Sequence, residues 1–169
     1  MVNFSVCLIG KNAEKTLPRL IASLGGFLGR GGEVVLVDTG STDGTVEVGR
    51  AAGFSVHCVG DKFVFDMPPG IADKINARFV AEGEAPIVRQ GDRLFDYAAA
   101  RNHSAFLATN DVVSMPDCDE QFSVCDIDAI EEAIRRGYEQ MEFHFIFSHY
   151  PNGQPAVQFK QTKWNSICS

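Results

Sequence analysis

Two short apolar runs that end in acidic residues constrain the fold of this chain most strongly. Residues 34–37 (VVLV) lead into Asp38, and residues 112–116 (VVSMP) lead into the acidic segment 117–120 (DCDE). Such a run is typical of a buried parallel strand that carries a carboxylate at its C-terminal edge. In open α/β sheets, ligands bind at this edge. The two runs therefore predict one binding site that is built from both strand ends.

The first sixty residues alternate between strand and helix patterns. The expected strands and helices, in chain order, are residues 4–9, 17–24, 33–37, 42–52 and 54–59. Thr16 is expected to cap the first helix, and the glycines at 25–26 and 29–32 are expected to end it. A β-α-β-α-β order over so short a stretch is typical of parallel α/β architecture.

Residues 60–92 interrupt this alternation. They are rich in proline and glycine, and they show little periodicity apart from a short helix expected at 71–80. Irregular insertions of this length in a compact domain are usually functional or mobile. We interpret the segment either as part of a lid or as a surface elaboration.

The remaining elements follow from apolar periodicity. A helix is expected at 95–108, with an inward face at Phe95, Ala98, Ala99, Asn102 and Phe106. Asp126 is expected to cap a further helix, whose inward residues are Ile127, Ile130 and Ile134. Alternating Phe143, Phe145 and Phe147, a turn at 151–153 and a returning strand at 157–164 predict a C-terminal β-hairpin.

Composition bounds the class of protein. With 169 residues, 45% of them hydrophobic and 22% charged, the chain is expected to form a single soluble domain over 1–169. Its formal net charge of -7 argues against a nucleic-acid partner. Five scattered cysteines without a CxxC pair favour reduced thiols and a cytoplasmic location. No signal peptide or membrane-spanning segment is expected, which leaves a membrane-surface role open.

Four segments form an ordered set of motifs, in chain order VCLIGKN at 6–12, VDTGSTDGT at 37–45, ARN at 100–102 and DCDE at 117–120. Together they resemble family 2 glycosyltransferases with the GT-A fold. Their order and spacing make the resemblance specific over roughly the first 122 residues, apart from the 60–92 insertion. The resemblance implies a GT-A (Rossmann-like) α/β fold with a mostly parallel, twisted sheet that is flanked by helices.

The same resemblance implies an activity. The chain is expected to transfer a sugar from a nucleotide-diphospho-sugar, a UDP-sugar above all, to an acceptor hydroxyl with inversion. A hard divalent ion, Mg²⁺ or Mn²⁺, can stabilise the charge of the departing diphosphate. By family likeness Asp119 binds the metal, and Asp117 faces the metal's water shell or the ribose.

Further donor-binding residues also follow from the resemblance. Asp38 is expected to accept a hydrogen bond from a uracil-like base, and Ile9, Lys11 and Asn12 are expected to flank the base and ribose. Arg101 supplies a cation for the diphosphate or the sugar. The alternatives are structural: Asp38 in a turn, the Asp-x-Asp segment in a surface loop, and Arg101 as a solvated helix residue.

Other polar residues in these segments have structural interpretations. Asp43 is expected to serve turn and helix-cap chemistry, because Ser-Thr-Asp-Gly-Thr is typical of both. Asn102 shares an apolar helical face and is interpreted as a buried hydrogen-bonding residue. His103, His144 and His149 lack metal-ligand spacing.

The C-terminal part departs from the family pattern. Inverting members deprotonate the acceptor with a carboxylate that lies downstream of the Asp-x-Asp strand. Here the chain stops fifty residues after Asp119, and its tail at 160–165 holds no acidic motif. The catalytic base is therefore unassigned, and the chain is expected to be either a fragment of a longer enzyme or a minimal donor-binding domain.

Two other functions are considered. One is a non-catalytic module of the same fold that binds a nucleotide-sugar. The other is an aspartic protease, because DTGS at 38–41 also matches that active-site loop. The protease alternative requires an all-β chain and a second such carboxylate, whereas this sequence alternates strands with helices.

Overall fold

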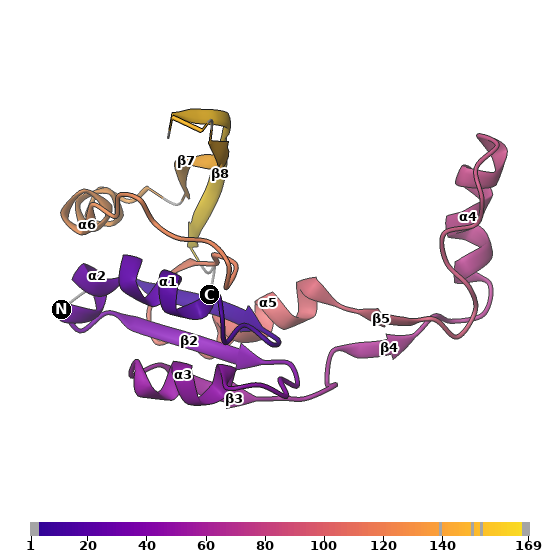
Figure 1. Ribbon diagram of the computed structural model, residues 1–169, viewed down its shortest axis with the longest axis horizontal. Coiled ribbons are helices and arrows are strands. Elements are labelled where there is room, and N and C mark those ends of the chain that lie inside the picture. Colours follow the sequence, from indigo (N-terminus) through magenta and orange to yellow (C-terminus); the bar gives the residue numbers. More distant parts are fainter. Residues whose placement is uncertain (1–3, 139, 150, 153, 167–169) are drawn as a thin grey trace.

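A mostly parallel sheet forms the centre of the molecule (Figure 1). The computed structural model describes residues 4–138, 140–149, 151–152 and 154–166. In this part of the chain, six strands lie in the order β3-β2-β1-β6-β8-β7. Their bounds are Ser5–Gly10 (β1), Glu33–Asp38 (β2), Ser55–Cys58 (β3), Val112–Ser114 (β6), Gln140–His149 (β7) and Pro155–Ser166 (β8). The first four in spatial order are parallel, and β8 runs antiparallel to both β6 and β7. The expected α/β fold class is confirmed.

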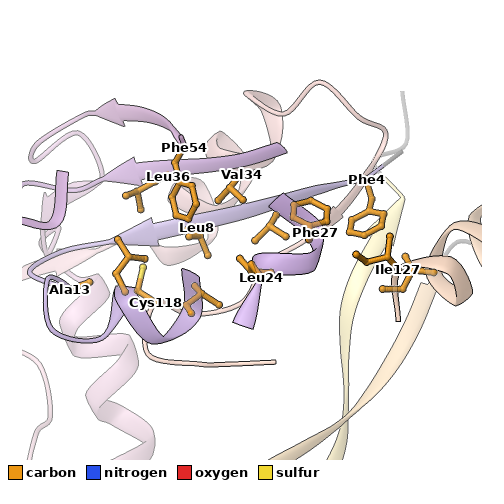
Figure 2. Close-up of a cluster of buried hydrophobic side chains, with 14 of the residues drawn as sticks. Phe4, Leu8, Ala13, Leu24, Phe27, Val34, Leu36, Phe54, Cys118 and Ile127 are labelled. Carbon is orange, nitrogen blue, oxygen red and sulfur yellow. The ribbon is translucent and has the colours of Figure 1, made fainter. Parts of the chain in front are cut away.

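The larger core lies between one face of the sheet and four helices (Figure 2). These helices are α1 (Leu17–Ser23), α2 (Gly25–Gly29), α3 (Thr45–Ala51) and α6 (Ile127–Arg135). Alternate residues of β1 and β2 point into this layer, namely Val6, Leu8, Val34 and Leu36. The intervening residues Cys7 and Val35 face the opposite layer, where they pack against Ala105 of α5 (Tyr97–Phe106). Burial on both faces explains why these strands read as continuous apolar runs.

One expectation for the first helix is wrong. Thr16 precedes α1 but makes no side-chain capping bond to it; its hydroxyl donates to the Ala13 carbonyl at 3.3 Å. Helix α1 ends at Ser23, just before the glycines as expected, and Gly25–Gly29 then forms a second short helix, α2. Packing of Phe27 in the core outweighs the low helix propensity of glycine here.

Helix α5 differs from the expected one in its start and in its buried face. It begins at Tyr97, where the side chain of Asp96 accepts from the Ala99 amide at 2.9 Å. Its buried residues are Ala100, Ser104 and Ala105, whereas Asn102 and Phe106 are exposed. Small side chains let the helix lie close against the sheet. This close packing buries the face of small residues in place of the face that the apolar pattern predicts.

The 60–92 insertion forms a projecting arm, which we define as residues 61–95 (Figure 1). The arm consists of β4 (Val64–Asp66), α4 (Ile71–Ala81) and β5 (Arg93–Phe95), and β4 pairs antiparallel with β5. The helix expected at 71–80 is confirmed. At the base of the arm, the Phe63 ring lies 5.5 Å from the His103 ring of α5, measured between centroids. A lid function of this segment stays a prediction.

The C-terminal half follows the expected order. The Asp126 side chain caps α6 by accepting from the Ala129 amide at 3.0 Å, and Ile127 and Ile130 are buried. Strands β7 and β8 form the expected hairpin, although the side chains of Phe143, Phe145 and Phe147 lie outside the described residues. Within the described part of the chain, no helix is long and apolar enough to cross a membrane.

Cys7 is buried and Cys58 is exposed, and this difference predicts unequal reactivity of the two thiols. Burial, with a smaller contribution from the charge of Glu33, raises the pKa of the Cys7 thiol to about 12. At pH 8 only about one in ten thousand Cys7 side chains is then a reactive thiolate. Cys58 is a free, exposed cysteine. Iodoacetamide at pH 8 should therefore alkylate Cys58 and spare Cys7, as read by peptide mass spectrometry. Equal labelling of both in the folded protein would contradict the burial of Cys7, and a urea-unfolded sample controls for intrinsic reactivity.

Candidate functional site

The loops after β1 and β2 are held together by reciprocal hydrogen bonds. The amide of Asn12 donates to the Ser41 hydroxyl at 2.9 Å, and the Thr42 amide donates to the Asn12 side chain at 2.8 Å. The Ala13 amide donates to the Thr45 hydroxyl at 2.7 Å. Asn12 adopts a positive φ of 55°, which asparagine tolerates better than most residues. Its side chain therefore positions the two loops.

Asp43 belongs to the same network. Its carboxylate accepts from the amides of Thr45 and Glu14 at 3.1 and 3.2 Å, and the Gly44 amide donates to the Glu14 carboxylate at 3.1 Å. The hydrogen bond from the Thr45 hydroxyl is the main reason that the pKa of Asp43 is lowered. The expected structural role of Asp43 is confirmed by these contacts.

Asp38 ends β2 as the sequence predicts, and its side chain is 3% exposed. The carboxylate accepts from the amides of Gly40 and Ser41, both at 3.2 Å. These are the contacts of the structural alternative, a turn that starts at Asp38. The neighbouring Thr39 lines the cleft described below, and its hydroxyl donates to the Gly10 carbonyl at 3.1 Å. A role of Asp38 in base recognition stays a prediction.

The acidic segment after β6 forms a tight turn. The Glu120 amide donates to the Asp117 carbonyl at 3.0 Å, so the Asp-x-Asp residues lie in a turn and not on an extended segment. Cys118 is buried, and its thiol donates to the Ile9 carbonyl at 3.3 Å. Burying this central residue leaves Asp119 exposed and Asp117 half-exposed. The turn thus attaches both carboxylates to the end of β1.

A cleft of about 610 Å³ lies where these strand ends meet the arm. One wall comes from the strand ends and their loops, through Ile9, Gly10, Lys11, Thr39, Asp117 and Asp119. The other wall comes from the arm and the start of α5, through Asp61, Val64, Arg93, Leu94, Phe95 and Tyr97, with Arg101 further along α5. The structure therefore brings Ile9, Lys11, Arg101, Asp117 and Asp119 together in one lining. It leaves Asp38 and Asn12 outside the lining.

Two ion pairs belong to the cleft lining, one between its two walls and one within the arm wall. Arg101 donates to Asp117 at 2.6 Å, so Arg101 is not simply solvated, and Arg93 donates to Asp61 at 2.8 Å. All four side chains are at least 40% exposed, and exposed pairs of this kind stabilise a fold only weakly. The pKa of Asp61 is lowered mainly by its hydrogen bond from Arg93, with a further contribution from Lys11. Because each pair is weakly held, either arginine can exchange its partner for an anionic ligand.

Apart from Arg101, the residues of the arm wall were not predicted from the sequence as site residues. Asp61, Arg93, Phe95 and Tyr97 lie within or beside an insertion that shows little periodicity, and their proximity to Asp117 depends on how the arm leaves the sheet. One local signal was available. Asp96 precedes a helix in the manner of a capping residue, and it would have moved the helix start past Phe95.

The carboxylates fit a divalent ion only in part. Across the described residues, no three or more His, Cys, Asp or Glu side chains are grouped so that they could hold a metal ion. Asp119 makes no hydrogen bond or ion pair within the described part of the chain, whereas Asp117 is paired with Arg101. Mg²⁺ is commonly held by one or two carboxylates together with substrate phosphates. Asp117 and Asp119 fit that mode of binding and do not form a complete site by themselves.

Comparison with known proteins adds a structural likeness. No protein-family model matches the chain, and no curated protein matches it in sequence. Two crystal structures of TarS from S. aureus, one of them of TarS 1–349 in complex with UDP, superpose on 81% of the chain with a TM-score of 0.52 and 22% identity. The chain spans 20% and 33% of the length of these two structures. The likeness shows that the fold is similar to a glycosyltransferase fold.

Proposed function

We propose that the cleft binds a nucleotide-diphospho-sugar, specifically a UDP-sugar, as the donor site of a glycosyltransferase similar to family 2. The sugar would be transferred to an acceptor hydroxyl with inversion. The observation that carries the proposal is the meeting of Lys11 and Arg101 with Asp117 and Asp119 at the carboxyl ends of β1 and β6. This is the edge at which open α/β sheets bind nucleotides. The likeness to TarS, a glycosyltransferase that was crystallised with UDP, supports the same class of ligand.

The charges of the cleft support a requirement for a divalent ion. Three cationic side chains, Lys11, Arg93 and Arg101, are matched by three carboxylates, Asp61, Asp117 and Asp119. A diphosphate adds two negative charges to this neutral lining, which Mg²⁺ or Mn²⁺ would balance. Asp119 and Asp117 are the residues that would hold the ion. When bound, it would stabilise the charge of the departing nucleotide diphosphate.

The residues of the chain contribute binding and orientation. Arg101 can move from Asp117 to a phosphate oxygen, and this exchange frees the Asp117 carboxylate within the same cleft. Lys11 supplies a second positive charge from the loop that Asn12 holds in place. Ile9 and Gly10 offer an apolar surface for the base, at the strand end to which Cys118 is bonded.

No residue of the described chain is proposed as the catalytic base. A non-catalytic module that binds the nucleotide-sugar has the same donor cleft, and transfer rather than binding separates the two functions. The four described cysteines are free, which supports the proposed cytoplasmic location.

Isothermal titration calorimetry tests the donor proposal. UDP and UDP-sugars should bind the protein in Mn²⁺, and EDTA should weaken that binding at least about tenfold, because the diphosphate loses its counter-charge. GDP serves as the control for base selectivity. Nucleotide binding that does not respond to metal would contradict metal dependence, and no nucleotide binding at all would exclude the donor site. Binding without sugar release or transfer would favour the module.

A further inference from the structure

The arm wall of the cleft differs chemically from the strand-end wall. The strand ends present charged, small and aliphatic side chains and no aromatic ring, whereas the arm wall contains two aromatic rings, Phe95 and Tyr97. Their ring centroids are 4.7 Å apart with an interplanar angle of 84°, so the edge of one ring meets the face of the other. Edge-to-face contact of this kind holds aromatic rings in place. Tyr97 is nevertheless 65% exposed, which leaves most of this supported ring open.

Polar side chains lie on the same wall. Arg93 and Asp61 form an ion pair there, with 62% and 58% of their side chains exposed. Both groups are planar and can each bind two adjacent hydroxyls, the guanidinium as donor and the carboxylate as acceptor. An exposed aromatic ring next to planar polar groups matches a pyranose, which has an apolar C–H face and a rim of hydroxyls.

The arm wall is also attached firmly enough to act as a fixed surface. The Asp96 amide donates to the Phe63 carbonyl at 2.8 Å, and the Met67 amide donates to the Asp92 carbonyl at 2.8 Å. The Phe63 ring also contacts His103 of α5. The contacts of Phe63 connect the base of the arm to the helix that carries Tyr97. Tyr97 therefore lies on the same helix as Arg101, and Phe95 at the end of β5 packs against the Tyr97 ring.

We propose that the arm wall is a sugar subsite, in which a pyranose ring stacks on Tyr97 and its hydroxyls bind Arg93 and Asp61. The subsite rests on the proposed function, because it lies opposite the strand ends where the nucleotide would bind. Two sources share the required chemistry, the hexose of the donor and the terminal hexose of a saccharide acceptor. Both place the reacting sugar between the arm and Asp119.

The test compares Tyr97→Ala with the unaltered protein in Mn²⁺, by calorimetry with UDP, UDP-glucose and UDP-N-acetylglucosamine. In a second experiment, saturation-transfer NMR measures the binding of maltose, cellobiose and N-acetylglucosamine, with and without saturating UDP. If the donor hexose occupies the subsite, Tyr97→Ala weakens the UDP-sugars about fivefold to tenfold more than it weakens UDP. If an acceptor saccharide occupies it, the variant instead lowers the saccharide signal by a similar factor.

Matched variants separate stacking from structural damage. Phe106→Ala removes an aromatic ring of the same helix that is 82% exposed and lies outside the cleft lining. This variant should change neither the calorimetry nor the NMR result. Tyr97→Phe keeps the ring and should retain most of the sugar binding. If Tyr97→Ala lost affinity equally for UDP and UDP-sugars, or lost no binding in either experiment, the subsite would be overturned. Failure of the unaltered protein to bind UDP would instead refute the donor proposal. The NMR experiment with saccharides and without UDP would still test the subsite.

Discussion

Replacing Asp119 with alanine is expected to remove the metal-dependent part of UDP binding, a loss of about a hundredfold in affinity in Mn²⁺. Asp119 is the cleft carboxylate that no described cation neutralises, whereas Asp117 is already paired with Arg101 at 2.6 Å. Without Asp119, a divalent ion would have only Asp117 as a protein ligand, and Asp117 would still be shared with Arg101. Titration of UDP with and without Mn²⁺, in variant and unaltered protein, measures the difference.

The fold should survive this change, because Asp119 is exposed and lies in a turn whose buried residue is Cys118. Asp111→Ala is the matched control, since it removes an exposed carboxylate just before β6 and outside the cleft lining. That variant should bind UDP and Mn²⁺ as the unaltered protein does. If Asp119→Ala kept the full response to Mn²⁺, the metal would have to be held by other residues.

Strands β1 and β2 could be predicted from the sequence because they are short continuous runs that are buried on both faces. Apolar runs at β1 and β2 leave few other structures open, and Gly53 and Asp126 mark helix ends through their own backbone or capping chemistry. The face of α5 could not be predicted in this way. Ala98, Ala99 and Ala100 are equivalent in hydropathy, and only contact with the sheet distinguishes them.

The site residues also differ in how far they could be predicted. Asp117 and Asp119 could be placed at the sheet edge because they follow an apolar strand, whereas Lys11 was expected from the family resemblance. The backbone contacts of Asp38 depend on the turn through Gly40, which has a φ of 95°. Tyr97 enters the cleft only because the arm returns to the sheet beside it, and no pattern within residues 60–92 specifies that path.

Replacing Phe27 with alanine is expected to lower the free energy of unfolding by about 3–5 kcal/mol, the largest stability effect among these predictions. Phe27 is 1% exposed, and its ring stacks on Phe4 with centroids 4.8 Å apart (Figure 2). It also lies against Gly32, where any Cβ would collide with the ring. Since domains of this kind are stable by only about 5–15 kcal/mol, the variant should unfold at much lower urea concentration.

Urea unfolding monitored by circular dichroism measures this loss, and Phe106→Ala supplies the control. That variant makes the same substitution at a ring that is 82% exposed, so its effect should stay within about 0.5 kcal/mol. Phe27 lies outside the cleft lining, and the folded fraction of Phe27→Ala should therefore bind UDP with the affinity of the unaltered protein. A loss below about 1 kcal/mol would mean that α2 does not close the core between β1 and α6, and the packing described for this layer would be wrong.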